Sequence, residues 1–283
     1  MKTQNLLRLA GPVLFGGLLF VVTPAAFAQS ASTYVTSAAE KYRNGDYDGA
    51  IADYNQALDL NSSYVSAYNG RGLAKNGQGN FDGAIADFSA AIKLKPEFAE
   101  AYFNRGNAEF LQGNMDPAIA DFSKVIELKP DSGAAYFRRG LARDCETNYE
   151  GAAADYAKAQ EHHLGNNAAS SSIALHAALL TKRSGGDVGA QLKSAADWSD
   201  WWSTKVAAFL AGSLSDTQLL ALAGNGEPDT QTRQQCEAWY FIGMTKVISG
   251  HKAGAKADFQ KAFDASGPAV IVHRLSRVQL DRS

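Results

Sequence analysis

The sequence VSAYNGRGLAKNGQGNFDGAIADFSAAIKLKPEF, residues 65–98, is followed directly by AEAYFNRGNAEFLQGNMDPAIADFSKVIELKPDS, residues 99–132. Each stretch is 34 residues long, and their aromatic, glycine and alanine positions fall in the same order. Tyr68 and Tyr102, for example, occupy the same place in the two stretches. A fixed period of about 20 to 50 residues indicates stacked structural repeats, each of which packs on its neighbours.

The same period extends to both sides of this pair. It defines four units, 31–64, 65–98, 99–132 and 133–166. Four rows of residues carry it: Tyr34, Tyr68, Tyr102 and Tyr136; Ala50, Ala84, Ala118 and Ala152; Asp53, Asp87, Asp121 and Asp155; Tyr54, Phe88, Phe122 and Tyr156.

Each unit predicts two helices joined by a short turn. In the second unit, Tyr68 lies on a first helix, while Ala84 and Phe88 lie at helical spacing on a second helix. Gly79 is expected to end the first helix, and Asp82 to open the second as an N-cap or first-turn acid. Neither helix buries its apolar face alone, whereas stacked units share one core. The period therefore predicts an all-α solenoid.

A similar unit returns late in the chain, at 236–269. Its matching positions are Trp239, Gly243, Gly250, Ala255, Phe259, Ala262 and Gly267. The intervening residues 167–235 have room for two degenerate helix pairs, and helices are expected near 167–183, 187–197, 199–212 and 215–223. Residues 224–228 are expected to form a loop or hinge, and 270–280 a C-terminal capping helix within the last segment, 236–283.

The second unit carries a family signature. Eight of its residues match the places that define the tetratricopeptide repeat (TPR): Tyr68, Gly72, Gly79, Phe81, Ala84, Phe88, Ala91 and Pro96. The chain thus resembles the TPR family, which implies a helix-turn-helix solenoid wound as a right-handed superhelix. In that family the first helices line a concave surface that holds a peptide or a partner helix. The resemblance therefore implies binding without catalysis.

Residues beside the buried stripe of each first helix are the candidate lining of this groove. Side-chain amides can meet the donors and acceptors of a peptide backbone, and aromatic rings supply apolar area. The predicted groove residues are Asn69, Leu73, Phe103, Asn104, Asn107, Phe137, Arg138 and Leu141.

One subclass of the family clamps a peptide's terminal carboxylate with two lysines, two asparagines and an arginine. Here Asn104 and Arg138 stand at matching places, but Asn69, Leu73 and Ala134 stand at the other three. Capture in that particular manner is therefore not expected. Arg138 retains the capacity to meet an acidic group through a charge-assisted bond, the alternative being a merely solvated side chain.

A second set of arginines precedes a glycine in three units. Arg71, Arg105 and Arg139 stand where the family usually has an apolar residue, and an aspartate recurs in every unit. We expect a structural Arg–Asp ladder. The sequence leaves open whether each arginine pairs within its own unit or with the aspartate of the preceding one.

A cluster of aromatic residues marks the late segment: Trp198, Trp201, Trp202 and Phe209. The three tryptophans are spaced i, i+3, i+4, which favours a packed core, and any exposed remainder would form an interface. The layout of 200–275 also resembles bacterial periplasmic TPR adaptors, including an outer-membrane TPR lipoprotein that dimerises. An alternative hypothesis is accordingly a structural homodimer assembled through these residues.

The first 28 residues have the pattern of a secretory signal peptide. Lys2 and Arg8 precede an apolar run over 9–22, and small residues stand at the positions that a signal peptidase needs, ending in Ala28. Cleavage after Ala28 is expected, which would leave residues 29–166 as the four-unit part of an exported, periplasmic or secreted, protein. The run is shorter than the roughly 20 residues that span a bilayer, so no membrane span is expected in the mature chain. The cysteine that would carry a lipid anchor is absent.

Composition narrows the function further. The chain has 283 residues, 46% hydrophobic and 20% charged, with a net charge of −2, which argues against a nucleic acid as the main partner. Signatures of nucleotide, hydrolase and redox sites do not occur, and none of the five histidines is paired at zinc-ligand spacing. No catalytic residue, metal or cofactor is therefore expected, although a hydrolase remains a third hypothesis. Cys145 and Cys236 are expected to be buried thiols rather than a bridge.

Overall fold

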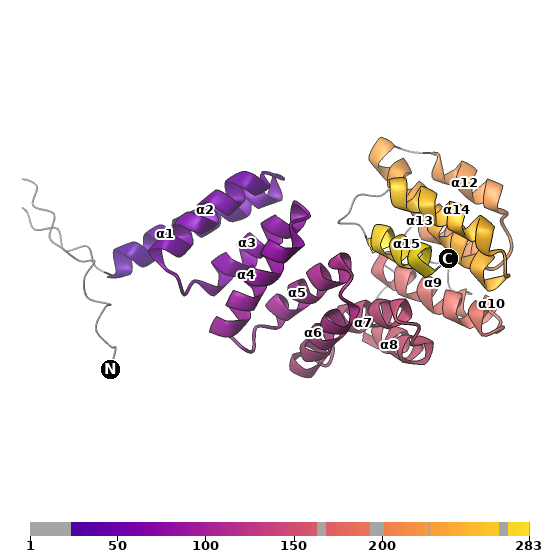
Figure 1. Ribbon diagram of the computed structural model, residues 1–283, viewed down its shortest axis with the longest axis horizontal. Coiled ribbons are helices and arrows are strands. Elements are labelled where there is room, and N and C mark those ends of the chain that lie inside the picture. The colour runs from indigo at the N-terminus through magenta and orange to yellow at the C-terminus, as the bar shows by residue number, and fades with distance from the viewer. Residues whose placement is uncertain (1–23, 163–167, 193–200, 226, 266–270, 283) are drawn as a thin grey trace, which may run out of the picture.

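The computed structural model describes residues 24–162, 168–192, 201–225, 227–265 and 271–282, and all regular elements in those ranges are helices (Figure 1). Each of the first four units holds one helix pair. These pairs are α1 (Pro24–Arg43) with α2 (Tyr47–Leu60), α3 (Val65–Gly77) with α4 (Phe81–Leu94), α5 (Ala99–Gln112) with α6 (Met115–Leu128), and α7 (Gly133–Cys145) with α8 (Tyr149–His162). The all-α solenoid that the sequence predicts is confirmed.

The later helices overlap the segments where the sequence predicts them, except that one helix begins at Pro228, inside the predicted loop 224–228 and before the predicted unit 236–269. They are α9 (Ala168–Arg183), α10 (Gly189–Leu192), α11 (Trp201–Leu210), α12 (Asp216–Ala223), α13 (Pro228–Ile248), α14 (Lys252–Ala265) and α15 (Ile271–Arg282). The helix expected at 187–197 is described only over α10, because 193–200 lies outside the described residues. The predicted cleavage position after Ala28 falls within α1, and the preceding residues 1–23 are not described.

Glycines with positive φ end the first helices of the early units. Gly45, Gly79 and Gly113 have φ of 78°, 75° and 106°, a region that side chains with a Cβ rarely adopt. In the fourth unit Thr147 takes this place at φ 63°. The side chain just before the second helix can then accept a backbone N–H: Asn80 accepts from Gly83, so Asp82 is the first-turn acid rather than the cap.

Glycines inside the first helices allow the two helices of a unit to approach closely. A Cβ at Gly72 would lie 2.6 Å from Cε1 of Phe88, so no larger residue fits there without a shift. The same contact recurs at Gly243, where the distance to Cε1 of Phe259 is also 2.6 Å. The late unit therefore packs by the same rule as the early ones.

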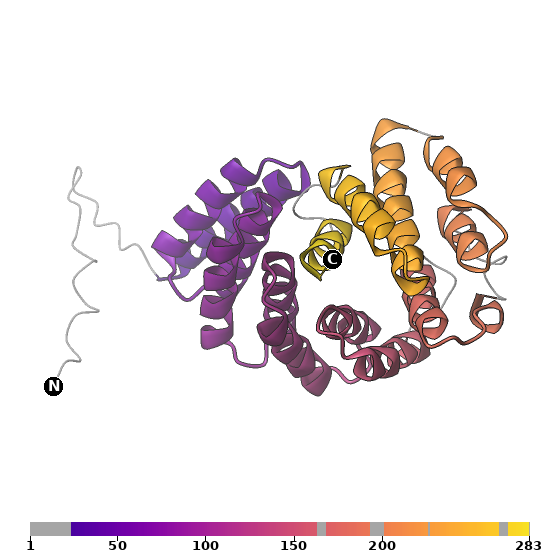
Figure 2. The same cartoon turned by 45° about the vertical axis from the view of Figure 1, so that its right-hand side comes forward.

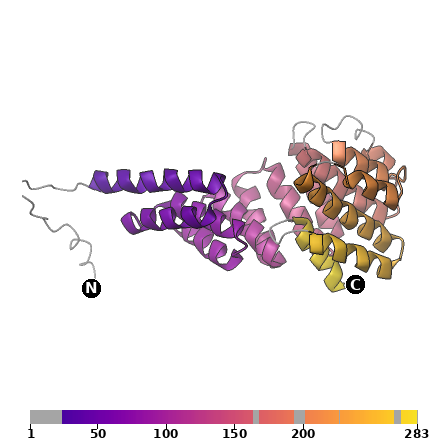
Figure 3. The same ribbon diagram turned by 90° about the horizontal axis from the view of Figure 1, so that it is seen from above.

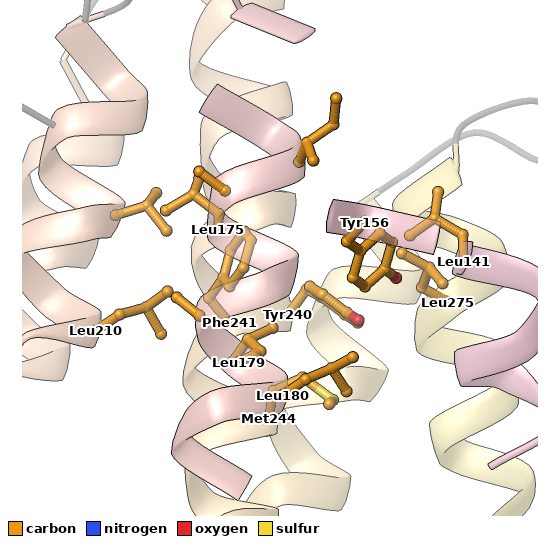
Figure 4. Close-up of a cluster of buried hydrophobic side chains, with 14 of the residues drawn as sticks. Leu141, Tyr156, Leu175, Leu179, Leu180, Leu210, Tyr240, Phe241, Met244 and Leu275 are labelled. Carbon is orange, nitrogen blue, oxygen red and sulfur yellow. The ribbon is translucent and has the colours of Figure 1, made fainter. Parts of the chain in front are cut away.

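The helices stack side by side into an elongated, curved array (Figure 3). The core is divided, because a cluster around α1–α3 is separate from the large cluster that runs from α5 to α15. Figure 4 shows part of the large cluster, in which side chains of α8, α9 and α13 meet. The last helix, α15, packs on α14 as the next helix of the stack, and it also lies inside the curve, where it contacts α5 and α13 (Figure 2). The inner face of the solenoid is thus partly occupied by the chain itself.

Candidate peptide-binding face

Two asparagines of the predicted groove form a line of amides between neighbouring units. The Asn104 side-chain N–H donates to Oδ1 of Asn69 at 3.1 Å, and the Asn69 side-chain N–H donates to Oε1 of Glu100 at 3.0 Å. Asn69 is only 6% exposed, so its main role is to join α3 to α5. Asn104 and Asn107 are half-buried, and Asn107 forms no hydrogen bond with any described residue.

The apolar residues of the predicted groove turn partly inward. Phe103 packs against Phe122 with ring centroids 5.8 Å apart, and Phe137 packs against His176 at 5.6 Å. Leu73 is half-buried against the small cluster of α4 and α5. These side chains therefore offer a partner only part of their area.

Leu141 does not line an open surface. It is 1% exposed and belongs to the same core cluster as Leu275 of α15 and Tyr156 of α8 (Figure 4). The position is correctly placed on the inner face of α7, but α15 covers it. Repeat periodicity contains no information on a helix that folds back from more than 130 residues away, which is why the prediction of an accessible Leu141 is wrong.

Arg138 is the exception among the arginines of the repeats. Its side chain is half-buried on the inner side of α7, and burial alone lowers the pKa of its guanidinium to about 10. Across the described ranges, no residue forms a hydrogen bond or an ion pair with it. Arg138 is therefore a partly buried cation without a counter-ion among the described residues.

The neighbouring arginines are fully engaged, which resolves the alternatives that the sequence leaves open. Each pairs with the aspartate of its own unit: Arg139 donates from Nη2 and Nε to the two carboxylate oxygens of Asp155, at 2.7 and 3.0 Å. Its Nη1 also donates to Oγ of Ser123 in the preceding unit, at 3.0 Å. Arg71 with Asp87 and Asn55, and Arg105 with Asp121 and Ser89, repeat this arrangement.

Sequence reasoning missed a second cation that reaches the same aspartates. It stands 12 residues before the carboxylate, as in Lys75 to Asp87 at 2.7 Å and Arg143 to Asp155 at 2.8 Å. The late unit repeats it with Lys246 and Asp258, at 2.6 Å. The spacing of 12 is visible in the sequence of these units and could have indicated the pairs, although the third unit has Glu109 at this place. These ion pairs join the two helices of a unit, and they do not belong to the candidate binding face.

Sequence reasoning also missed Asp144, a carboxylate beneath α15. It is 6% exposed, and its Oδ1 has no hydrogen-bond partner among the described residues. Burial raises the pKa of Asp144 to about 6, against the lowering effect of Arg183 and Arg282, which face it from α9 and α15. The sequence could have indicated Asp144 because it departs from the repeat pattern: the preceding unit has Phe110 at the corresponding position.

Comparison with known proteins agrees with the repeat architecture. Family models match three parts of the chain: one described as a TPR repeat at residues 40–79, and two described as tetratricopeptide repeats at 75–133 and 237–267. The chain contains tetratricopeptide repeats over residues 40–133 and 237–267. No curated protein matches its sequence.

Solved structures show the same fold for this TPR protein. A tetratricopeptide repeat protein from Parabacteroides merdae is 15% identical over 89% of this chain and 99% of its own, with a TM-score of 0.62. The MamA protein is 22% identical over 61% and 97%, with a TM-score of 0.53. YrrB, described as a TPR protein with an unusual peptide-binding site, is 19% identical over 68% and 100%, with a TM-score of 0.52. The TPR resemblance inferred from the sequence is confirmed.

The late aromatic cluster of the TPR protein divides between core and surface. Trp202 is 2% exposed and its indole N–H donates to Oε2 of Glu237 at 2.7 Å, while Phe209 is also buried. Trp201 is 48% exposed, with the Lys205 ammonium 5.4 Å from its ring centroid. Trp198 lies outside the described residues. Two of the four predicted interface residues are therefore core residues in this structure.

The remaining chemistry of the described TPR chain is sparse. Cys145 and Cys236 are buried free thiols, and burial raises the pKa of Cys145 to about 12. Within the described ranges, no group of three or more His, Cys, Asp or Glu is placed to hold a metal ion. None of the helices described is both long and apolar enough to cross a membrane.

Proposed function

We propose that this TPR protein is a non-catalytic scaffold of the periplasm, which holds a peptide segment or a partner protein of the cell envelope on its inner face. The observation that carries the proposal is Arg138. Four arginine and lysine side chains of the neighbouring ladder satisfy two aspartates, whereas Arg138 is partly buried and has no partner among the described residues.

A partly buried cation without a counter-ion can accept an acidic group of a partner as its counter-ion. A charge-assisted hydrogen bond from a guanidinium to a carboxylate is roughly twice as strong as a neutral one. Asn104 and Asn107 stand on the adjoining helix α5, with side-chain amides suited to a peptide backbone. Phe103 and Phe137 add apolar area beside them. The expected ligand is therefore a peptide with an acidic residue or a terminal carboxylate.

Two further observations support the proposal. YrrB, whose fold this chain shares at a TM-score of 0.52, is described as having a peptide-binding site. The location rests on the sequence alone, namely the basic start, the apolar run over 9–22 and the small residues before position 29.

In-cell crosslinking from the periplasm, followed by mass spectrometry, tests this function. The double variant Arg138→Glu with Asn104→Ala should lose most of the captured partner, by about tenfold or more, because a carboxylate would face the partner's acidic group. The matched control is Arg233→Glu, the same charge change at an exposed site of α13. Circular dichroism must show equal helicity in all three proteins. Unchanged capture by the double variant would reject this face as the binding site.

The homodimer hypothesis now rests on less surface than the sequence indicated. Trp202 and Phe209 are buried, so Trp201 is the exposed member of the cluster within the described part of the chain. Single exposed apolar residues are common on monomers. Sedimentation at several concentrations tests the hypothesis, since a concentration-independent monomer would remove it. The hydrolase hypothesis gains no candidate residue from the structure described.

A further inference from the structure

The last helix packs on α14 at the end of the array and also covers part of the inner face. Leu275 and Val278 of α15 are buried, and Leu275 lies in the cluster with Leu141 and Tyr156 (Figure 4). Figure 2 shows α15 inside the curve, between the early units and α13 and α14. The helix thus covers the part of the inner face that lies toward the C-terminal ends of α5 and α7.

Charge complementarity explains the position of α15. The Arg274 guanidinium abuts Gly113, at the C-terminal end of α5, so closely that a Cβ there would collide with it. Arg282 faces Asp144 and Cys145, the last residues of α7. The C-terminal end of a helix carries partial negative charge and attracts cations. The covered surface therefore favours a basic helix.

The residue pattern of α15 is typical of an amphipathic helix that docks in a groove. Arg274, Val278 and Arg282 are spaced four residues apart, which places them on one stripe of the helix, and Leu275 lies beside that stripe. Two buried apolar anchors flanked by two cations is the arrangement by which an amphipathic helix docks in a groove. The last helix therefore has the form of a ligand.

The polar fit between α15 and the inner face is nevertheless poor. Within the described structure, three buried polar atoms here have no hydrogen-bond partner: Nε of Arg274, Oδ1 of Asp144 and the hydroxyl of Tyr156. Buried polar atoms in folded proteins are nearly always paired, and each unpaired one weakens the packing that buries it. By contrast, the nearby carboxylate of Asp155 receives both Arg139 and Arg143.

From this combination we infer that α15 is a displaceable self-ligand. It opens from the inner face, and the surface that it uncovers accepts an amphipathic helix of a partner protein, with two apolar anchors and cations placed as in α15. A partner helix that supplies hydrogen bonds to Asp144 and Tyr156 displaces α15 because α15 leaves these groups unpaired. The inference rests on the proposed function only in that the partner uses the same inner face, beyond the Arg138 subsite.

Hydrogen–deuterium exchange on the full chain tests the opening without any partner. Amides of α15 should exchange on the order of a hundredfold faster than those of the buried part of α13, since local openings need less free energy than global unfolding. Leu275→Ala should speed exchange in α15 by about tenfold or more and leave α3 and α4 unchanged. The matched control is Leu58→Ala, which alters the separate cluster around α1–α3. Exchange of α15 in step with α13 would overturn the inference.

Binding of a labelled peptide of residues 271–282 tests the second half. The full-length Leu275→Ala protein should bind it about tenfold more tightly than the unaltered protein, because its own α15 competes less well. A peptide carrying Leu275→Ala and Arg282→Glu should bind neither protein. Rapid opening of α15 without binding of the peptide would overturn the inference that α15 is a self-ligand. Failure of Arg138→Glu to affect capture, with both α15 results as expected, would instead reject the proposed function alone.

Discussion

Replacement of Asp144 by asparagine should stabilise the protein at neutral pH and remove part of its pH dependence. The buried carboxylate has its pKa raised from 3.8 to about 6, despite the facing cations Arg183 and Arg282. The folded state therefore binds this proton more tightly than the unfolded state. Stability from this group is greatest below pH 3.8, falls as the pH rises toward 6, and stays low above it.

The magnitude follows from the difference between the two pKa values. At about 1.36 kcal/mol per unit, a rise from 3.8 to about 6 corresponds to about 3 kcal/mol lost at pH 7 relative to strongly acid pH. The asparagine side chain avoids the charge but buries an amide, so we expect a net gain of about 1–3 kcal/mol at pH 7. The gain should shrink toward zero, or reverse, at about pH 4.

Urea unfolding at several pH values between about 4 and 8 measures this effect. The matched control is Asp131→Asn, which changes a carboxylate in an exposed turn. If Asp144→Asn lost more than about 1 kcal/mol at pH 7 while the pH profile kept its shape, the ion would be satisfied by its arginines and the reasoning would be refuted.

Two further predictions concern adjacent arginines and the thiols. Arg139→Ala should lower the free energy of unfolding in urea by about 2–3 kcal/mol, because it removes two hydrogen bonds to buried Asp155 and leaves that carboxylate with only one cation. Arg138→Ala should change the free energy of unfolding by less than about 1 kcal/mol. Equal losses for both would contradict the distinction between them. In a thiol assay, Cys145 and Cys236 should react slowly in the native protein and yield two thiols per chain after denaturation; a count of zero would establish a disulfide.

The repeated units could be predicted from the sequence because local chemistry decides them. Glycines such as Gly79, where φ is positive, and Gly72, where a ring approaches, recur in most units because the same turn and contact recur there, although Thr147 takes the turn position in the fourth unit. The inner-face strip followed from helical spacing, and Arg138 in it became meaningful once its lack of a partner among the described residues was known.

Features set by contacts between distant segments could not be predicted in the same way. Leu141 lies where the groove was expected, but nothing near it in sequence indicates that Leu275 covers it. Adjacent Trp201 and Trp202 point about 100° apart on their helix, so one is exposed and the other buried, which spacing alone does not assign. Asp144 has no counterpart in the other units, so no row of the repeat drew attention to it.

The Arg–Asp ladder makes each joint between units self-contained. At each junction, the later unit contributes the arginine and its aspartate, and the preceding unit contributes one serine or asparagine, as Ser89 does for Arg105. A tandem copy of residues 65–98, inserted after position 98, would bring both halves of that joint with it. The array can therefore lengthen by duplication of whole units without new substitutions at the junction between units. Each duplication would lengthen the inner face by one unit.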